Sequence, residues 1–164
     1  MKAEQIKPEK HFCRWESPIG MLAAAEDGVG ISDLFLCGRD VPKEFREETT
    51  PLLQETVRQL VEYFDGKRKE FSLPLSLRGT RFQLADWKAL RAIPYGETRS
   101  YRQIAEQIGC PKGFRAVGMA NHNNPVMIVV PCHRVVAADG SLGGYACGLD
   151  AKRFLLELEQ AHAN

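Results

Sequence analysis

One short stretch, Pro131 to Arg134, contains a cysteine followed at once by a histidine and an arginine. The thiolate is the reactive form of a cysteine, and a neighbouring imidazole or guanidinium group favours it over the thiol. The apolar, β-branched run before it, residues 127–130, predicts a buried strand that ends at the proline. Two interpretations stay open from these residues alone, a nucleophilic Cys132 and a buried structural cysteine.

Helices are predicted ahead of this stretch. Thr80 and Gln83 have the types and spacing of a capping box, and Ser100 and Gln103 form a second one. A turn containing glycine separates the second helix from a third, short helix, which is the helix-turn-helix pattern. Arg115 lies at the start of the third helix, the end from which such proteins contact DNA. Many helix corners share this pattern and bind nothing.

The chain before these helices predicts a small antiparallel sheet followed by a helix. Residues 12–36 contain short apolar runs, and Asp27-Gly28 between them favours a two-residue hairpin turn. A helix is expected to begin at Thr50 and to end at Gly66.

A Pro- and Gly-containing segment, residues 73–79, predicts a linker. We therefore expect two domains, an N-terminal α/β domain over residues 1–77 and a mostly helical domain with the helix-turn-helix over residues 78–164. The fold class is α/β in the broad sense, more closely α+β.

The chain after Cys132 contains a glycine-rich loop and a last helix. Four glycines fall within residues 140–148, so the loop leaves room beside whatever it faces. Asp150 is predicted to cap the helix. Glu159 lies four residues after Leu155 on the apolar stripe of that helix, and a carboxylate facing inward needs a partner. His133 is the candidate partner.

Composition limits the possible functions. The 164 residues begin with a charged segment that has no secretory signal, and none of the apolar runs is long enough for a membrane span. Five cysteines without a CxxC pair favour a reducing, cytoplasmic setting over disulfides or structural zinc. Residues 78–134 hold nine Lys/Arg and three acids, a charge of +6 that suggests an anionic partner such as a phosphate backbone. An ordinary basic surface is the alternative.

Together these motifs resemble a known family. Residues 80–159 are similar to the catalytic domain of the O6-alkylguanine-DNA alkyltransferases, also called methylated-DNA–protein-cysteine methyltransferases. The resemblance rests on Ile93-Pro94-Tyr95-Gly96, Ser100-Tyr101, Ala105, Arg115-Ala116-Val117-Gly118, Asn124-Pro125, Pro131-Cys132-His133-Arg134-Val135, Gly144-Tyr145 and Leu155-Leu156-x-x-Glu159, with a weaker match at Ser17-Pro18-Ile19-Gly20. It makes residues 78–164 the catalytic DNA-binding domain.

The resemblance implies single-turnover transfer of an alkyl group from O6-alkylguanine, and from O4-alkylthymine, to Cys132. Attack is on a saturated carbon, so an oxyanion hole is not required. His133 would take the thiol proton through a water molecule, Glu159 would orient His133, and Tyr101 would donate toward guanine N3. Asn124 would hold the turn that carries the site.

The resemblance also implies minor-groove binding and rotation of the damaged base out of the duplex. Arg115 would fill the gap that the base leaves. The expected DNA-binding residues are Arg115, Ala116, Gly118, Tyr101, Arg134 and Ser100. The expected alkylguanine pocket is formed by Tyr145, Ala146, Gly143, Gly144, Val135 and Met127. The partner is alkylated double-stranded DNA, and we expect a cytoplasmic monomer that binds no membrane, metal or cofactor.

Two positions depart from relatives of this family. Met127 stands where some carry a second proline, and Ala146 where others carry serine. The small side chain at 146 leaves space, so alkyl groups larger than methyl are expected to react.

Three other classes of protein remain to be weighed. A non-catalytic sensor of alkylated DNA would lack the nucleophile, whereas Cys132 is present. A helix-turn-helix regulator would need a dimerising element and has no use for Cys-His-Arg. A Cys–His hydrolase usually takes the two residues from separate segments, and neighbours on an extended strand point to opposite faces.

Overall fold

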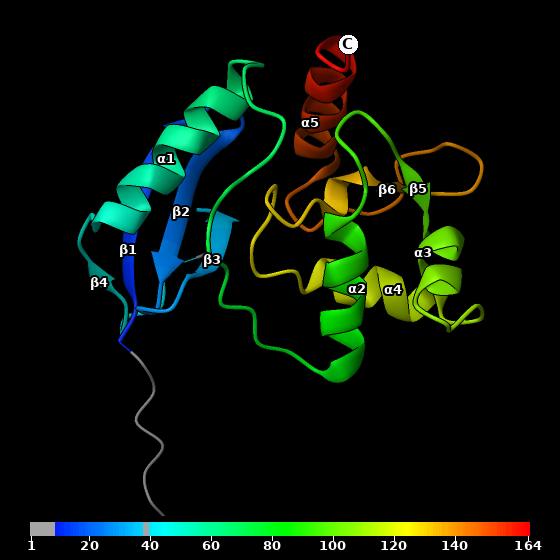
Figure 1. Cartoon of the computed structure of the whole chain (residues 1–164), viewed down its shortest axis with the longest axis horizontal. Helices are drawn as coiled ribbons and strands as arrows, with labels where there is room; N and C mark the ends of the chain where they lie inside the picture. Colours follow the sequence, from blue (N-terminus) through cyan, green and yellow to red (C-terminus); the bar gives the residue numbers. More distant parts are fainter. Residues whose placement is uncertain (1–8, 38–39) are drawn as a thin grey trace, which may run out of the picture.

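The computed structural model describes residues 9–37 and 40–164. The N-terminal part is a sheet ordered β3-β2-β1-β4, formed by β1 (His11–Ser17), β2 (Gly20–Glu26), β3 (Ile31–Leu36) and β4 (Arg46–Glu47). The strands β1, β2 and β3 pair antiparallel, and β4 pairs in parallel with β1. One helix, α1 (Pro51–Phe64), packs against β1 and β2 (Figure 1).

The sequence signals in this part predict most of its structure. Thr50 is the N-cap of α1, and its hydroxyl accepts from the backbone N–H of Leu53 at 3.2 Å. The helix ends two residues before Gly66, which has φ +74°. The turn between β2 and β3 is wider than the predicted two-residue hairpin, because Asp27 Oδ1 accepts from the backbone N–H groups of both Val29 and Gly30.

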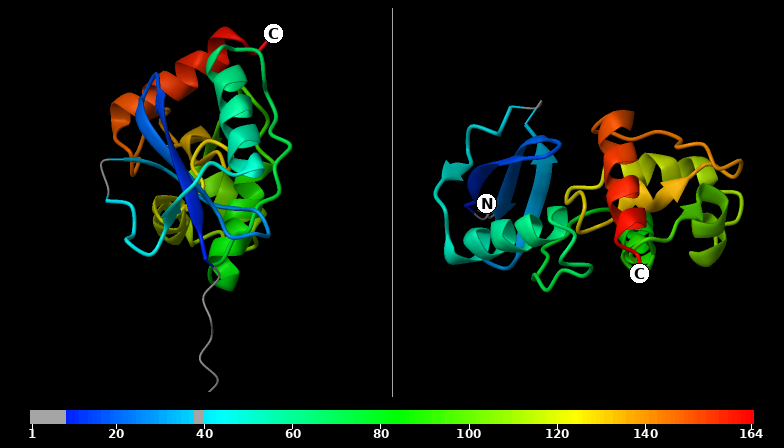
Figure 2. Two further views of the ribbon diagram at one scale, coloured as in Figure 1. Left: turned by 90° about the vertical axis from the view of Figure 1, so that its left-hand side faces the viewer. Right: turned by 90° about the horizontal axis from the view of Figure 1, so that it is seen from above.

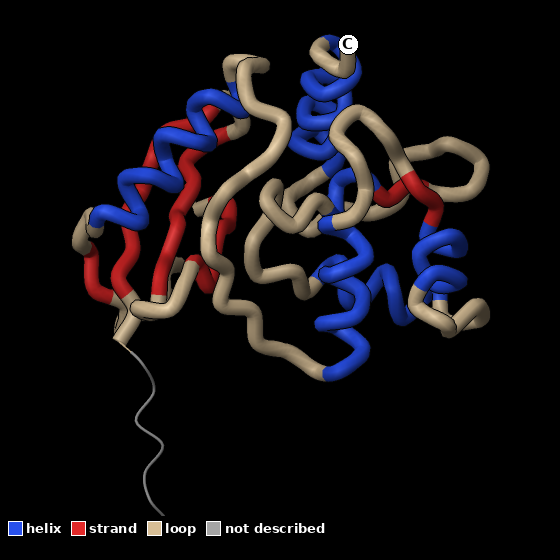
Figure 3. The backbone as a smooth tube through the Cα atoms, viewed as in Figure 1, coloured by secondary structure: helices blue, strands red, loops and turns tan. Residues whose placement is uncertain are grey.

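The C-terminal part contains α2 (Arg81–Arg91), α3 (Tyr101–Gln107), α4 (Phe114–His122) and α5 (Leu149–Ala161). Two short parallel strands, β5 (Arg99–Ser100) and β6 (Val135–Val136), and one 3₁₀ turn, η1 (Cys132–Arg134), complete it. Both predicted capping boxes are present, and α4 packs on α2 and α3 as the helix-turn-helix pattern predicts. Figure 2 shows the two parts side by side, and Figure 3 shows how much of the C-terminal part is helix and loop. The predicted fold class is confirmed.

The two parts meet along β3. Leu34 of β3 donates its N–H to Pro125 O at 2.8 Å and accepts from Met127 N at 3.1 Å. At the other end of the strand, Ile31 donates to Pro74 O and accepts from Ser76 N, both at 2.8 Å. The predicted linker, residues 73–79, is therefore hydrogen-bonded to the sheet, and buried side chains of both parts share one hydrophobic core. The domain boundary near residue 78 stays a prediction. None of the helices in residues 9–37 and 40–164 is long and apolar enough to cross a bilayer.

Two local predictions are wrong. Residues 127–130 form a buried turn, since Val130 N donates to Val126 O at 3.0 Å and Ile128 has φ +71°. A short apolar run marks burial, but burial alone does not distinguish a strand from a turn. The N-cap of α5 is Gly148 rather than Asp150, which lies in the first turn, where its charge favours the helix dipole.

Candidate active site

Cys132 lies at the start of η1 and exposes 7% of its surface. Asn124 contacts the thiol directly, because its Nδ2 donates to Cys132 Sγ at 3.2 Å and to Val130 O at 2.7 Å. Its Oδ1 accepts from Val126 N at 2.9 Å. One amide thus holds the turn before the cysteine closed and places a donor on the sulfur.

The surroundings of Cys132 favour a thiol at rest. Burial raises the pKa of Cys132 to about 11, although the hydrogen bond from Asn124 and the charge of Lys152 oppose the rise. A thiol with this pKa is a poor nucleophile at neutral pH, so the site needs a base.

His133 and Glu159 form a buried pair beside the cysteine. His133 Nε2 lies 2.5 Å from Glu159 Oε2, and their side chains expose 0% and 1% of their surfaces. Burial alone would raise the pKa of Glu159, but His133 and Arg134 outweigh it and lower the pKa to about 2. Burial lowers the pKa of His133, so its ring is neutral and donates from Nε2 to the carboxylate. Its Nδ1 is then an acceptor, and it has no hydrogen-bond partner among the described residues.

Cys132 and His133 both lie on the 3₁₀ turn η1. If the backbone were extended there, their side chains would point to opposite faces. The bent backbone instead leaves the thiol at the wall of a cavity while the imidazole reaches α5.

A cavity of about 310 Å³ lies against Cys132. Its lining residues are Tyr101, Gly118, Asn121, His122, Cys132, Gly144, Tyr145 and Ala146. The Tyr145 hydroxyl is buried and lies beside the Cys132 thiol. The volume of the cavity falls at the lower end of the usual range for small-molecule sites.

Only some of the predicted pocket residues line this cavity. Gly144, Tyr145 and Ala146 line the cavity. Gly143 lies against Tyr101, since a Cβ at its position would be 2.8 Å from the Tyr101 hydroxyl oxygen, and its φ of +69° also favours glycine. Val135 and Met127 are outside the wall of this cavity: Val135 is fully buried, and Met127 lines a second cavity of about 600 Å³.

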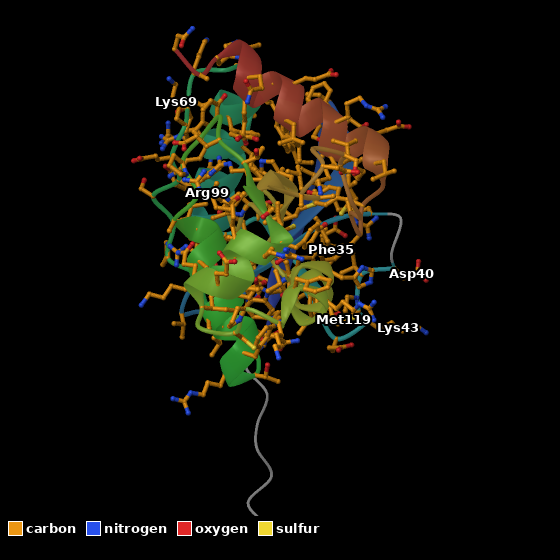
Figure 4. The ribbon with its side chains drawn as sticks, turned by 90° about the vertical axis from the view of Figure 1, so that its right-hand side faces the viewer. Phe35, Asp40, Lys43, Lys69, Arg99 and Met119 are labelled. Atoms are coloured by element: carbon orange, nitrogen blue, oxygen red, sulfur yellow. The ribbon has the colours of Figure 1, made fainter. Side chains whose placement is uncertain are left out.

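The predicted DNA-binding residues lie mainly on α3 and α4. Arg115 and Ala116 are exposed at the start of α4, while Ser100 and Tyr101 form the start of α3 and are half-buried. Gly118 lines the cavity. Figure 4 looks onto the side of the molecule that carries these helices.

Arg134 was predicted to bind DNA, but it does not lie on the surface with the other predicted DNA-binding residues. Its guanidinium group is buried and donates to Glu159 Oε1 at 2.7 Å and to Ile93 O at 2.7 Å. It therefore neutralises a carboxylate inside the protein and does not reach a DNA surface. Arg134 and Asp86 are the buried charges of residues 78–134, and without them this region still carries eight Lys/Arg and two acids.

Lys152 on α5 was not identified from the sequence. Its side chain is fully buried, and its Nζ donates to Val135 O at 2.6 Å and to Gly144 O at 3.1 Å. Burial lowers the pKa of Lys152 to about 8. It lies one turn before Leu155 on the same apolar stripe as Glu159, so the signal that singled out the glutamate could have found the lysine.

Asp86 and Asn121 form a second polar pair that sequence reasoning missed. Asp86 on α2 is fully buried. With its nitrogen turned to the carboxylate, the Asn121 amide donates to Asp86 Oδ2 at 2.6 Å and to Val117 O at 3.2 Å. The pair joins α2 to the wall of the cavity, because Asn121 lines it.

The chain is similar to known proteins. Residues 81–161 match the family model described as 6-O-methylguanine DNA methyltransferase, DNA binding domain, and residues 11–77 match its ribonuclease-like domain. A methylated-DNA–protein-cysteine methyltransferase of Methanosarcina barkeri is 50% identical over 149 residues, which cover 88% of this chain and 94% of the relative. The constitutive enzyme of that name from Bacillus subtilis is 47% identical over 157 residues, covering 92% and 95%.

The structure is also similar to solved structures. A crystal structure of Mycobacterium tuberculosis OGT in complex with DNA matches with a TM-score of 0.87 at 47% identity, covering 93% of this chain and 94% of the other. An O6-methylguanine-DNA methyltransferase from Pyrococcus kodakaraensis shares the fold, with a TM-score of 0.54 at 22% identity.

Proposed function

This chain belongs to the 6-O-methylguanine DNA methyltransferase family, and we propose that it repairs alkylated DNA by moving the alkyl group from guanine O6 to its own Cys132. The observation that carries the proposal is the environment of this thiol. Cys132 lies at the wall of a cavity, receives a hydrogen bond from Asn124 and precedes a buried, neutral His133 held by Glu159. A structural cysteine needs none of these.

The reaction begins with proton transfer from the thiol. A water molecule bound between Cys132 Sγ and His133 Nδ1 passes the proton to the imidazole, whose Nδ1 is the unpartnered acceptor. Glu159 stabilises the imidazolium, because its carboxylate stays ionised with a pKa of about 2. Asn124 stabilises the thiolate by its hydrogen bond.

The thiolate then attacks the saturated carbon of the alkyl group. A sulfur–carbon bond forms, the carbon–O6 bond breaks, and its electron pair moves onto guanine. Tyr101 donates its hydroxyl proton toward N3 of the departing base, and the imidazolium of His133 returns through water the proton that the thiol gave up, so the guanine leaves neutral and both side chains regain their starting state. The thioether product is a very poor leaving group, so each molecule acts once.

The target oxygen is reachable only when the base leaves the stack. We infer that the exposed start of α4 enters the minor groove, that Arg115 takes the place of the rotated base, and that Ala116 allows close approach. The basic surface of residues 78–134 binds phosphates with little sequence preference. This division of work assigns residues 78–164 to catalysis and DNA binding and residues 1–77 to an N-terminal domain.

O4-alkylthymine is a second substrate of the same site, because the chemistry at the alkyl carbon is unchanged. Transfer of one methyl group from an O6-methylguanine duplex to Cys132 tests the proposal, with Cys132→Ser as the control. A protein that binds the lesion tightly and stays unmodified would be a sensor of damage.

A further inference from the structure

Tyr63, in the last turn of α1, reaches across the protein to the proposed active site. Its ring is fully buried, and its hydroxyl donates to Glu159 Oε2 at 2.6 Å, although the two residues lie 96 positions apart in sequence. We propose that Tyr63 is a positioning residue for alkyl transfer, through which the N-terminal part fixes the carboxylate that orients His133. The inference rests on the proposed function.

The hydroxyl is aimed by the rings around it. Phe64, Phe71 and Tyr95 pack on Tyr63 with centroids 5.4, 5.5 and 6.2 Å away. A ring held on three sides has little freedom to turn its hydroxyl elsewhere. Glu159 is the hydrogen-bond partner of this hydroxyl within the described residues.

The carboxylate of Glu159 is held at both oxygens. Oε2 accepts from Tyr63 and from His133, and at 3.2 Å from an Arg134 terminal nitrogen. Oε1 accepts from Arg134 Nε at 2.7 Å and from Gly96 N at 3.3 Å. Arg134 neutralises the negative charge of the carboxylate. The Tyr63 hydroxyl acts at Oε2, the oxygen that faces the imidazole.

A neutral donor on Oε2 limits how strongly that oxygen attracts the His133 proton. His133 must be neutral before the reaction in order to accept a proton. Without the Tyr63 hydroxyl, Glu159 would bind imidazolium more tightly, and more of the protein would carry a histidine already protonated. The charged and titratable groups around the pair are Tyr63 from α1, Tyr95 before β5, Arg134 from η1 and Lys152 from α5.

The test compares Tyr63→Phe with Tyr95→Phe. Both remove one hydroxyl from the same aromatic cluster, but the Tyr95 hydroxyl is buried and has no hydrogen-bond partner among the described residues. The first readout is the single-turnover rate of methyl transfer between pH 5 and pH 9. The acidic limb of this profile is the range in which the rate rises with pH as His133 loses its proton. We expect Tyr63→Phe to shift this limb to higher pH by about half to one unit and to leave the rate at high pH within about twofold of the wild-type rate. Tyr95→Phe should leave the limb in place.

The second readout does not depend on methyl transfer. The ¹⁵N shifts of His133 report its protonation directly, so they test the contact even in a protein that proves inactive. An inactive wild type would refute the proposed function, whereas a normal reaction with unshifted His133 titration in Tyr63→Phe would refute this inference. A fall in rate by the same factor at every pH would also overturn it, because that is the signature of packing alone.

A third variant tests the same contact if Tyr63→Phe does not fold. Replacement of Tyr63 by 3,5-difluorotyrosine keeps the ring and makes the hydroxyl a stronger donor. The acidic limb should then move to lower pH, opposite to the effect of phenylalanine. Movement to higher pH, or none, would contradict the proposed role.

Discussion

His133 Nε2 and Glu159 Oε2 are 2.5 Å apart in a place where neither side chain exposes more than 1% of its surface. The pair fixes the direction of the imidazole. With Nε2 donating to the carboxylate, Nδ1 is left as the acceptor that we propose takes the Cys132 proton. The carboxylate on α5 therefore fixes which ring nitrogen of His133 is left to accept a hydrogen bond.

Glu159→Gln should impair both chemistry and stability. The amide has no charge to stabilise imidazolium, so the transfer rate of the folded protein should fall by about 10²-fold or more. The buried guanidinium of Arg134 loses its counter-ion, so the free energy of unfolding should fall by about 3–5 kcal/mol. Quenched single-turnover reactions measure the transfer rate, and urea unfolding measures the free energy of unfolding. Glu157→Gln, an exposed change on the same helix, should leave both unchanged, and an equal loss there would contradict the account.

Asp86 should make stability depend on pH. Burial raises the pKa of Asp86 to about 7. The folded state therefore binds more protons than the unfolded state between about pH 4 and pH 7, so the free energy of unfolding falls as pH rises through that window. We expect a loss of about 1–3 kcal/mol from this group. Asp86→Asn should remove that part of the slope in urea titrations at pH 5 and pH 8, and an unchanged slope would show that another group titrates.

Bulky alkyl groups should be accepted. The second cavity of about 600 Å³ shares Ala146 and His122 with the cavity at Cys132, and the apolar side chains of Leu34, Phe35 and Met127 contribute to its wall. The wild type should transfer benzyl from O6-benzylguanine in DNA. Ala146→Phe should slow benzyl transfer by about tenfold more than methyl transfer, while Ala138→Phe in the exposed loop should slow neither. Benzyl and ethyl rates at background in the wild type would refute the prediction.

Arg115→Ala should separate base rotation from chemistry. Filling the gap in the duplex stabilises the rotated base by a few kcal/mol, so transfer from duplex DNA should slow by about 10²-fold. Free O6-benzylguanine needs no rotation and should react at the wild-type rate. Arg102→Ala, an exposed cation on α3, should weaken duplex binding only modestly and lower its salt dependence. Equal losses on duplex and free base would place Arg115 in the chemistry itself.

Local signals predicted much of this fold because they act over a few residues. Thr80 and Ser100 form capping boxes with partners three residues away, and Thr50 caps α1 by the same rule. Glu159 could be singled out because a carboxylate on an apolar stripe must have a partner.

The remaining features depend on tertiary contacts. The backbone turn at Cys132 is formed by Asn124 and the packing of residues 127–130 against β3, which the apolar run alone does not encode. Arg134 looks like a DNA contact in the sequence because its buried partner lies 25 positions away. The contact of Tyr63 with Glu159 joins two parts of the chain that pair only in the fold, so no local pattern reveals it.

The most direct test is the intact mass of the protein after incubation with a duplex that contains one O6-methylguanine. The account predicts one added methyl group per chain, mapped to Cys132, saturating at one equivalent and absent from Cys132→Ser. The duplex should contain ordinary guanine afterwards. An unchanged protein mass, a methyl group on another cysteine, or more than one turnover per molecule would contradict it.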